Sequence, residues 1–148
     1  MAGSKSNNLS KKLLDAVLGQ NSAIPGYGGA INTVYVGLWV GAGVLGDTST
    51  GSTAGEPVGA SYSRSSVTNN ATNWPAATGT TVATKTNGTA IIFATAGAGG
   101  WGTVNQFAIV DNSAAGEILY WSDLTTPKGI AGNDTASFAI GALSITED

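Results

Sequence analysis

From Thr33 onward, the sequence consists of short runs of β-branched and aromatic residues that are separated by turns rich in Gly, Ser, Thr and Asn. This spacing is typical of an antiparallel β-sandwich or jelly roll rather than of alternating strands and helices. We therefore expect a mainly-β domain over residues 31–148, preceded by a short helix and a Gly-rich linker over residues 1–30. A chain of 148 residues is long enough to bury a hydrophobic core without disulfides or metal ions.

The clearest predicted strand is Thr33–Val40, in which aliphatic residues alternate with Tyr35, Gly37 and Trp39. Apolar side chains on both faces predict a central strand that is covered on both sides. In the last predicted strand the apolar residues change phase at Gly141-Ala142, which predicts a β-bulge there. The remaining predicted strands are Val58–Val67, Thr81–Thr86, Thr89–Thr95, Thr103–Asp111, Gly116–Trp121 and Ala136–Thr146.

The N-terminal segment is the part of the chain with helical periodicity. Ser6, Asn7 and Asn8 are candidate N-caps, and Gly19 is a candidate stop. Because the predicted helix is short, its apolar face needs a partner, either the domain that follows or a neighbouring subunit. Both partners stay open at this stage, and Asn21–Ala30 is expected to be a turn region. The apolar face consists of Leu9, Leu13, Leu14, Val17 and Leu18.

The composition excludes most of the common kinds of enzyme active site. The chain has no His and no Cys, so thiol nucleophiles, disulfides and Cys/His zinc sites are excluded. Charged residues make up 10% of the chain against a usual value of roughly 25%, and the carboxylates are dispersed along it. We predict no active site, no metal site and no cofactor. A net charge of −3 with a single Arg, Arg64, also argues against nucleic acid as a partner.

Two patterns that mimic functional segments are interpreted as consequences of the composition. The pattern G-x-G-x-x-G occurs at Gly41–Gly46 and Gly97–Gly102. A dinucleotide site needs a helix directly after the last Gly, because the helix N-terminus holds the pyrophosphate, and here a polar loop and a strand are expected instead. The uncharged stretch Asn21–Gly46 is rich in Gly and β-branched residues, so we expect no membrane span there.

Trp74 and Pro75 are the candidate binding residues outside the helix. They lie in the polar connection Thr68–Thr80, which is long enough to carry a function. An exposed Trp at this position would be able to stack on a sugar ring or to anchor a protein interface. A Trp that is folded back over the core is an equally good interpretation of the same residues.

The C-terminal third contains a series of motifs that resembles a family of small virion proteins of tailed phages and prophages, whose members are tail fibre-like or capsid decoration-like. The similarity extends to Ser4–Gly19, Thr33–Val40 and Asn69–Pro75 and so covers most of the chain. The motifs are turns and strand edges rather than catalytic signatures. They read Trp101-Gly-Thr-Val, Phe107-Ala-Ile-Val-Asp111, Gly116-Glu-Ile-Leu-Tyr-Trp121, Leu124-Thr-Thr-Pro-Lys128 and Gly132-Asn-Asp-Thr135.

The resemblance implies a non-catalytic virion subunit that is present in many copies and assembles in the host bacterial cytoplasm. Our first hypothesis is a capsid decoration or cement protein that binds the major capsid protein and bridges neighbouring subunits, as a homo-oligomer with a trimer favoured. The second is a tail, collar or tail-fibre component that binds other virion proteins. The third, from another class, is a carbohydrate-binding host-recognition module that uses Trp74 and the loop Asp47–Glu56 to hold a surface glycan.

Overall fold

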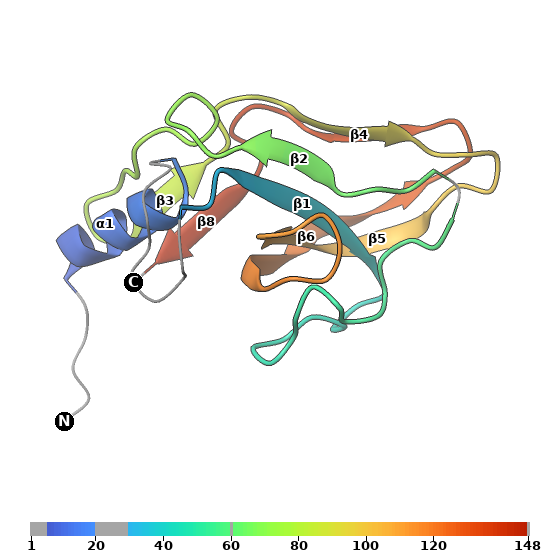
Figure 1. Cartoon of the computed structure of the whole chain (residues 1–148), viewed down its shortest axis with the longest axis horizontal. Coiled ribbons are helices and arrows are strands. Elements are labelled where there is room, and N and C mark those ends of the chain that lie inside the picture. Colours follow the sequence, from blue (N-terminus) through green and yellow to red (C-terminus); the bar gives the residue numbers. More distant parts are fainter. Residues whose placement is uncertain (1–5, 20–29, 60, 148) are drawn as a thin grey trace. The chain divides into compact units, whose positions relative to one another are not determined.

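The computed structural model describes residues 6–19, 30–59 and 61–147 (Figure 1). This part of the chain contains one helix and eight strands, and the strand pairs are antiparallel. The predicted class, mainly β with one short N-terminal helix, is confirmed. The elements are α1 (Asn7–Val17), β1 (Thr33–Val40), β2 (Ser65–Thr68), β3 (Ala83–Thr86), β4 (Ile91–Thr95), β5 (Gly102–Val110), β6 (Ile118–Ile130), β7 (Thr135–Phe138) and β8 (Ser144–Glu147).

The chain folds into two compact units that are each built from separate stretches of sequence. The helical unit consists of Met1–Asn32, Thr68–Ala90 and Phe138–Asp148, and it contains α1, β3 and β8. The sheet unit consists of Thr33–Val67 and Ile91–Ser137, and it contains β1, β4, β5 and β6 together with all but the last residue of β2 and of β7.

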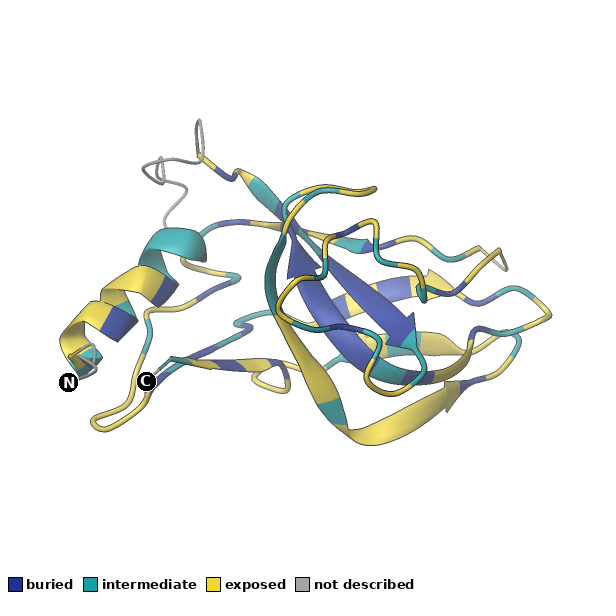
Figure 2. Ribbon diagram, turned by 90° about the horizontal axis from the view of Figure 1, so that it is seen from below, coloured by how far each residue is buried: buried dark blue, intermediate teal, exposed yellow. Residues whose placement is uncertain are grey.

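The centre of the sheet unit is a four-stranded sheet in the order β2-β1-β5-β6. Strand β1 has the predicted bounds and lies between β2 and β5, with Val36 opposite Ile109 and Leu38 opposite Phe107. It is buried along most of its length, because both of its faces carry apolar side chains (Figure 2). The expectation of a central, doubly covered strand is confirmed. On one face, a core cluster consists of Trp39, Leu45, Ala108 and Val110.

A buried arginine contacts several loops of the sheet unit. Arg64 is 8% exposed and forms an ion pair with Glu56, with 2.8 Å between Nη2 and Oε2. Its guanidinium also lies over the Trp39 ring, 5.7 Å from the centroid. The Tyr62 hydroxyl donates to Glu56 Oε1 at 2.8 Å and accepts from the backbone N–H of Leu38 at 2.8 Å. These contacts hold the segment before β2 against the central strand.

The helical unit is smaller and has α1 packed against the two-stranded β3–β8 sheet. In that sheet Ala83 lies opposite Glu147 and Thr86 lies opposite Ser144. The predicted turn region Asn21–Ala30 lies outside the described residues except for Ala30.

The prediction of one bulged C-terminal strand over Ala136–Thr146 is wrong. Two separate strands occupy this segment, because β7 pairs with β4 and β8 pairs with β3. The phase change at Gly141-Ala142 corresponds to a turn, in which Gly141 has a φ of 74° and the Ala142 N–H donates to the Ala139 carbonyl at 3.0 Å. A positive φ favours Gly. A Gly in this conformation can end a strand as well as form a bulge, so its presence did not distinguish the two.

The predicted strand Val58–Val67 is also too long, since β2 begins only at Ser65. The preceding residues instead direct Tyr62 and Arg64 into the cluster around Glu56. No helix follows either Gly-rich pattern in the described residues 41–59, 61–64 and 97–110, as expected. Among the described residues, no helix is both long and apolar enough to cross a bilayer.

Candidate functional site

Helix α1 is capped in the way that its sequence predicts. The Ser6 hydroxyl accepts a hydrogen bond from the backbone N–H of Leu9, with 3.3 Å between the two atoms. After the helix, Gly19 adopts a φ of 107°, a conformation that favours Gly. The predicted helix and both of its boundary signals are therefore confirmed.

One face of α1 is buried inside the helical unit. Ser10 and Leu14 are fully buried, and Leu18 directly after the helix is fully buried as well. The helix reaches β3 and β8 through this face. The chain itself thus provides the partner for this part of the apolar face.

A second part of the apolar face of α1 is not covered by the described residues. Leu9 and Leu13 are 46% and 40% exposed, and they lie one helical turn apart at positions i and i+4. Val17, one further turn along, is half-buried. Figure 2 shows the exposed and buried sides of the helix in yellow and dark blue. We call Leu9 and Leu13 the leucine ridge.

A buried ion pair holds α1 on the small sheet and so fixes the direction of the leucine ridge. Lys85 of β3 lies 2.8 Å from Asp15 of α1, measured from Nζ to Oδ1, and the two side chains are 1% and 23% exposed. The backbone N–H of Ala77 donates to the same carboxylate oxygen at 2.8 Å. A buried ammonium needs such a partner, because leaving it unpaired would cost several kcal/mol.

The C-terminal end of α1 is fastened by the side chain of Asn69, which is 2% exposed. Its amide nitrogen donates to the carbonyls of Val17 and Ile31 at 2.9 and 2.8 Å. Its carbonyl oxygen accepts from the N–H of Gly19 at 2.5 Å. One buried side chain therefore satisfies two backbone groups at the end of the helix and a third just before β1.

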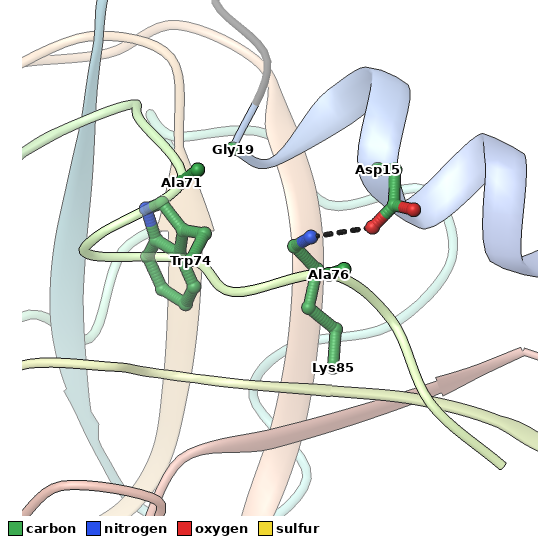
Figure 3. A pocket seen from close by; sticks show the side chains of 6 residues that line it. All are labelled: Asp15, Gly19, Ala71, Trp74, Ala76 and Lys85. Atoms are coloured by element: carbon green, nitrogen blue, oxygen red, sulfur yellow. Dashed lines mark hydrogen bonds and ion pairs between the residues drawn. The ribbon is translucent and has the colours of Figure 1, made fainter.

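Trp74 lies beside the ion pair and lines a small pocket of about 80 Å³. Figure 3 shows the Lys85 ammonium directed at the Asp15 carboxylate, with the Trp74 ring on the opposite side of Lys85 in this view. Within the described chain the indole N–H is buried and has no hydrogen-bond partner. A pocket of this size holds only a few water molecules, and ligand pockets are usually several times larger.

The predicted interface residues thus divide into two groups. Leu14 and Trp74 are fully buried, so they stabilise the helical unit and do not present their side chains to a partner. The interpretation of Trp74 as folded back over the core is the one that the structure supports. The residues that remain accessible are Leu9, Leu13 and Pro75, with Val17 half-buried.

The sequence analysis missed the polar residues that organise both units. Asp15, Asn69 and Lys85 were not singled out, and Arg64 was considered only for its charge. The composition contains a signal for Lys85. In a chain with so few charged residues, a Lys inside a predicted strand indicates that its charge has a role within the fold. In the described residues, no group of three or more His, Cys, Asp or Glu side chains is placed to hold a metal ion.

One comparison with known proteins identifies a family for the chain. No curated protein matches the chain. A family model described as podophage GP4 fiber I protein gp80 matches residues 4–146, which include α1 and all of the strands β1 to β7. The resemblance to small phage virion proteins is thereby confirmed. The chain belongs to the podophage GP4 fiber I protein gp80 family and is a phage structural protein.

Proposed function

We propose that this chain is a fibre subunit of a podophage virion and that the leucine ridge attaches it to a neighbouring virion protein. The observation that carries the proposal is the division of one helix face, in which Leu14 is fully buried while Leu9 and Leu13 are nearly half exposed. The family description names a fibre protein, and this supports the tail-fibre hypothesis at least as well as capsid decoration.

The ridge is suited to a contact that is repeated in many copies. Complete burial of a Leu side chain contributes about 2 kcal/mol, so burying the exposed parts of Leu9 and Leu13 would contribute about 1 kcal/mol each. A contact of this strength is weak for a single subunit. It becomes effective when several subunits of one particle are engaged at the same time, because linked contacts raise the avidity.

The proposed role is structural rather than catalytic. Asp15 with Lys85, and Glu56 with Arg64, form buried ion pairs. The first joins residues 70 positions apart, and Arg64 of the second also reaches the carbonyls of Asn112 and Ala115. The charged side chains of these two pairs therefore stabilise the fold. This use, together with the family description, supports a role in the particle as a non-enzymatic component.

The proposal is tested with particles that carry the double variant Leu9→Asp/Leu13→Asp. We expect purified particles to contain about tenfold fewer copies than wild-type particles, since loss of roughly 2 kcal/mol weakens one contact by more than tenfold. Quantitative immunoblotting of the particles measures the copies. Ile140→Asp, at a residue of the helical unit that is 70% exposed, is the matched control and should be incorporated normally.

The position on the particle is tested by separating tails from heads. A fibre subunit is expected in the tail fraction of disrupted particles, whereas co-purification with tailless heads would show that capsid decoration is the correct function. Normal incorporation of the folded double variant would show that the ridge is not the attachment surface. Circular dichroism of the purified variants establishes that they are folded.

A further inference from the structure

Asn87-Gly88, directly after β3, is the single Asn-Gly dipeptide of the chain. In such a dipeptide the backbone nitrogen of the Gly attacks the side-chain amide carbon of the Asn, and ammonia leaves. The resulting cyclic succinimide then takes up water and opens to Asp or to isoaspartate. A Gly in the second position favours this reaction, because it has no side chain to hinder the attack and leaves the backbone flexible. In the unfolded chain, Asn87 is therefore the Asn that we expect to lose its amide first.

The fold holds the side chain of Asn87 in a way that opposes this reaction. Asn87 is 1% exposed. Its amide nitrogen donates to the carbonyls of Thr89 and Ala139 at 2.8 Å each, and its side-chain oxygen accepts from the N–H of Leu143 at 2.9 Å. Both hydrogens of the leaving NH₂ group and the oxygen of the attacked amide are thus engaged. Turning the amide toward the Gly88 nitrogen would break these three hydrogen bonds.

The backbone on both sides of the reacting bond is fixed as well. The attacking group, the N–H of Gly88, donates to the carbonyl of Asn73 at 2.7 Å. The carbonyl of Asn87 accepts from the N–H of Gly141 at 2.9 Å, and its N–H donates to the carbonyl of Leu143 at 3.2 Å. All of these residues belong to the helical unit. Within the folded unit, the two reacting atoms are therefore kept out of the geometry of attack.

The packing also requires the two residues of this labile pair. An ideal Cβ on Gly88 would overlap the carbonyl oxygen of Thr72 and the ring of Pro75, so a residue with a side chain does not fit there. At Asn87 the contacts need two donors and one acceptor on a short side chain, and Asp lacks the donors. A carboxylate would face the two buried carbonyls that the amide binds, and it would leave them unpaired.

We propose that Asn87 is a deamidation site that is reactive in the unfolded chain and is closed by folding of the helical unit. The reaction would replace the NH₂ group by an oxygen that comes from water, with ammonia as the leaving group. Because the product does not fit the contacts of Asn87, a chain that stays unfolded for long loses the ability to complete the helical unit. A folded subunit keeps its amide. This protection suits a phage structural protein, since an assembled particle cannot replace its subunits.

Peptide mapping of the full-length protein by mass spectrometry tests the protection. Samples are incubated at the same mildly alkaline pH in buffer and in guanidinium chloride, and the conversion of each Asn to the acid is followed with time. Asn87 should react more than about a hundredfold more slowly in buffer, because a stably folded unit opens rarely. The internal control is Asn112-Ser113 in the exposed connection between β5 and β6, which reports any effect of the denaturant on the chemistry itself. Comparable rates for Asn87 in buffer and in denaturant would overturn the proposal.

A destabilised variant tests whether opening of the helical unit controls the rate. Asp15→Ala leaves the Lys85 ammonium without its partner, so the unit should open more often. Asn87 should then react at least about tenfold faster in buffer than it does in the wild type. Lys12→Ala, at an exposed position of the same helix, is the matched control and should leave the rate unchanged. A wild-type rate in Asp15→Ala, in a protein that urea denaturation shows to be destabilised, would contradict control by this unit.

The consequence of the modification is tested with Asn87→Asp, which carries the product side chain. This variant should unfold at a clearly lower urea concentration than the wild type or fail to fold. Asn112→Asp makes the same chemical change at an exposed residue and should keep the wild-type stability. Equal stability of the two variants would show that the helical unit accepts the product, against the proposal. None of these measurements involves the leucine ridge, so they are independent of the proposed attachment surface.

Discussion

The guanidinium of Arg64 binds both carboxylate oxygens of Glu56, with 2.9 Å between Nε and Oε1 and 2.8 Å between Nη2 and Oε2. Its remaining donors reach the backbone carbonyls of Gly51, Asn112 and Ala115 at 2.5 to 2.9 Å. A planar fork with five donors is required to reach these acceptors at the same time. The single Arg of the chain therefore joins three separate segments of the sheet unit.

Replacing Arg64 by Lys should lower the free energy of unfolding by about 3 kcal/mol, because one ammonium cannot reach the carboxylate and all three carbonyls. Urea denaturation followed by Trp fluorescence measures the change. The control is Lys128→Arg, the reverse exchange at an exposed position, which should change the stability by less than about 0.5 kcal/mol. Equal stability of Arg64→Lys and the wild type would contradict the assigned role.

The burial of Tyr62 predicts that the protein loses stability at alkaline pH. Burial raises the pKa of its hydroxyl above the ordinary value of 10.0, and the nearby Glu56 carboxylate raises it further. The unfolded chain therefore loses this proton at a lower pH than the folded protein does. The contribution of Tyr62 to the free energy of unfolding is complete below pH 10 and declines above it. The free energy of unfolding then falls by up to about 1.4 kcal/mol per pH unit.

Comparison with Tyr62→Phe isolates this effect from other titrations. The wild type should be the more stable protein at neutral pH, since Tyr62 donates to Glu56 and accepts from Leu38. Its advantage should shrink between about pH 10 and pH 11. Urea denaturation at each pH measures the difference, and a constant difference across this range would disprove the assignment.

Removing Asp15 should destabilise the helical unit by about 3 kcal/mol, because the Lys85 ammonium would stay buried without its partner. The variant Asp15→Ala tests this in urea denaturation, with Lys12→Ala as the exposed control on the same helix. Adding Lys85→Met to Asp15→Ala should restore part of the loss, because it removes the unpaired charge. If the two substitutions were instead additive, the ion pair would not couple the helix to β3.

Ser10→Ala should stabilise the protein by about 1 kcal/mol. The Ser10 hydroxyl is fully buried in α1 and has no hydrogen-bond partner in the described chain, so its removal relieves an unsatisfied polar group. Ala also has the higher helix propensity. Asn8→Ala, at an exposed position of α1, measures the propensity effect alone, and Ser10→Ala should exceed it in thermal and urea denaturation. A smaller gain for Ser10→Ala would contradict the expected cost of the buried hydroxyl.

The elements that the sequence predicted well are those determined by local pattern. Strand β1 has its predicted bounds because both faces are apolar over its full length, and α1 has its predicted ends because Ser6 and Gly19 act within a few residues of the helix. The predicted strands Thr103–Asp111 and Gly116–Trp121 correspond to β5 and the first part of β6, which pair on either side of the turn after Asp111. Pro127 lies in an edge strand, where a missing N–H is tolerated.

The features that sequence analysis could not provide depend on contacts between distant segments. The apolar spacing of Phe138–Ile145 is compatible with a bulge or with two strands, and only the pairing of β7 with β4 and of β8 with β3 distinguishes them. Trp74 occupies a polar loop, and its burial follows from α1 and β3 approaching it from elsewhere in the chain. Arg64 acts mainly on backbone carbonyls, which leave no trace in side-chain patterns.

The packing of α1 on both β3 and β8 also has a consequence for biosynthesis. The helix is translated before both of these strands, and the strand that completes its binding surface, Ser144–Glu147, is translated after the whole sheet unit. The surface on which α1 packs is therefore incomplete until synthesis reaches this strand. Complete packing of the helix therefore follows translation of β8, after the sheet unit has left the ribosome.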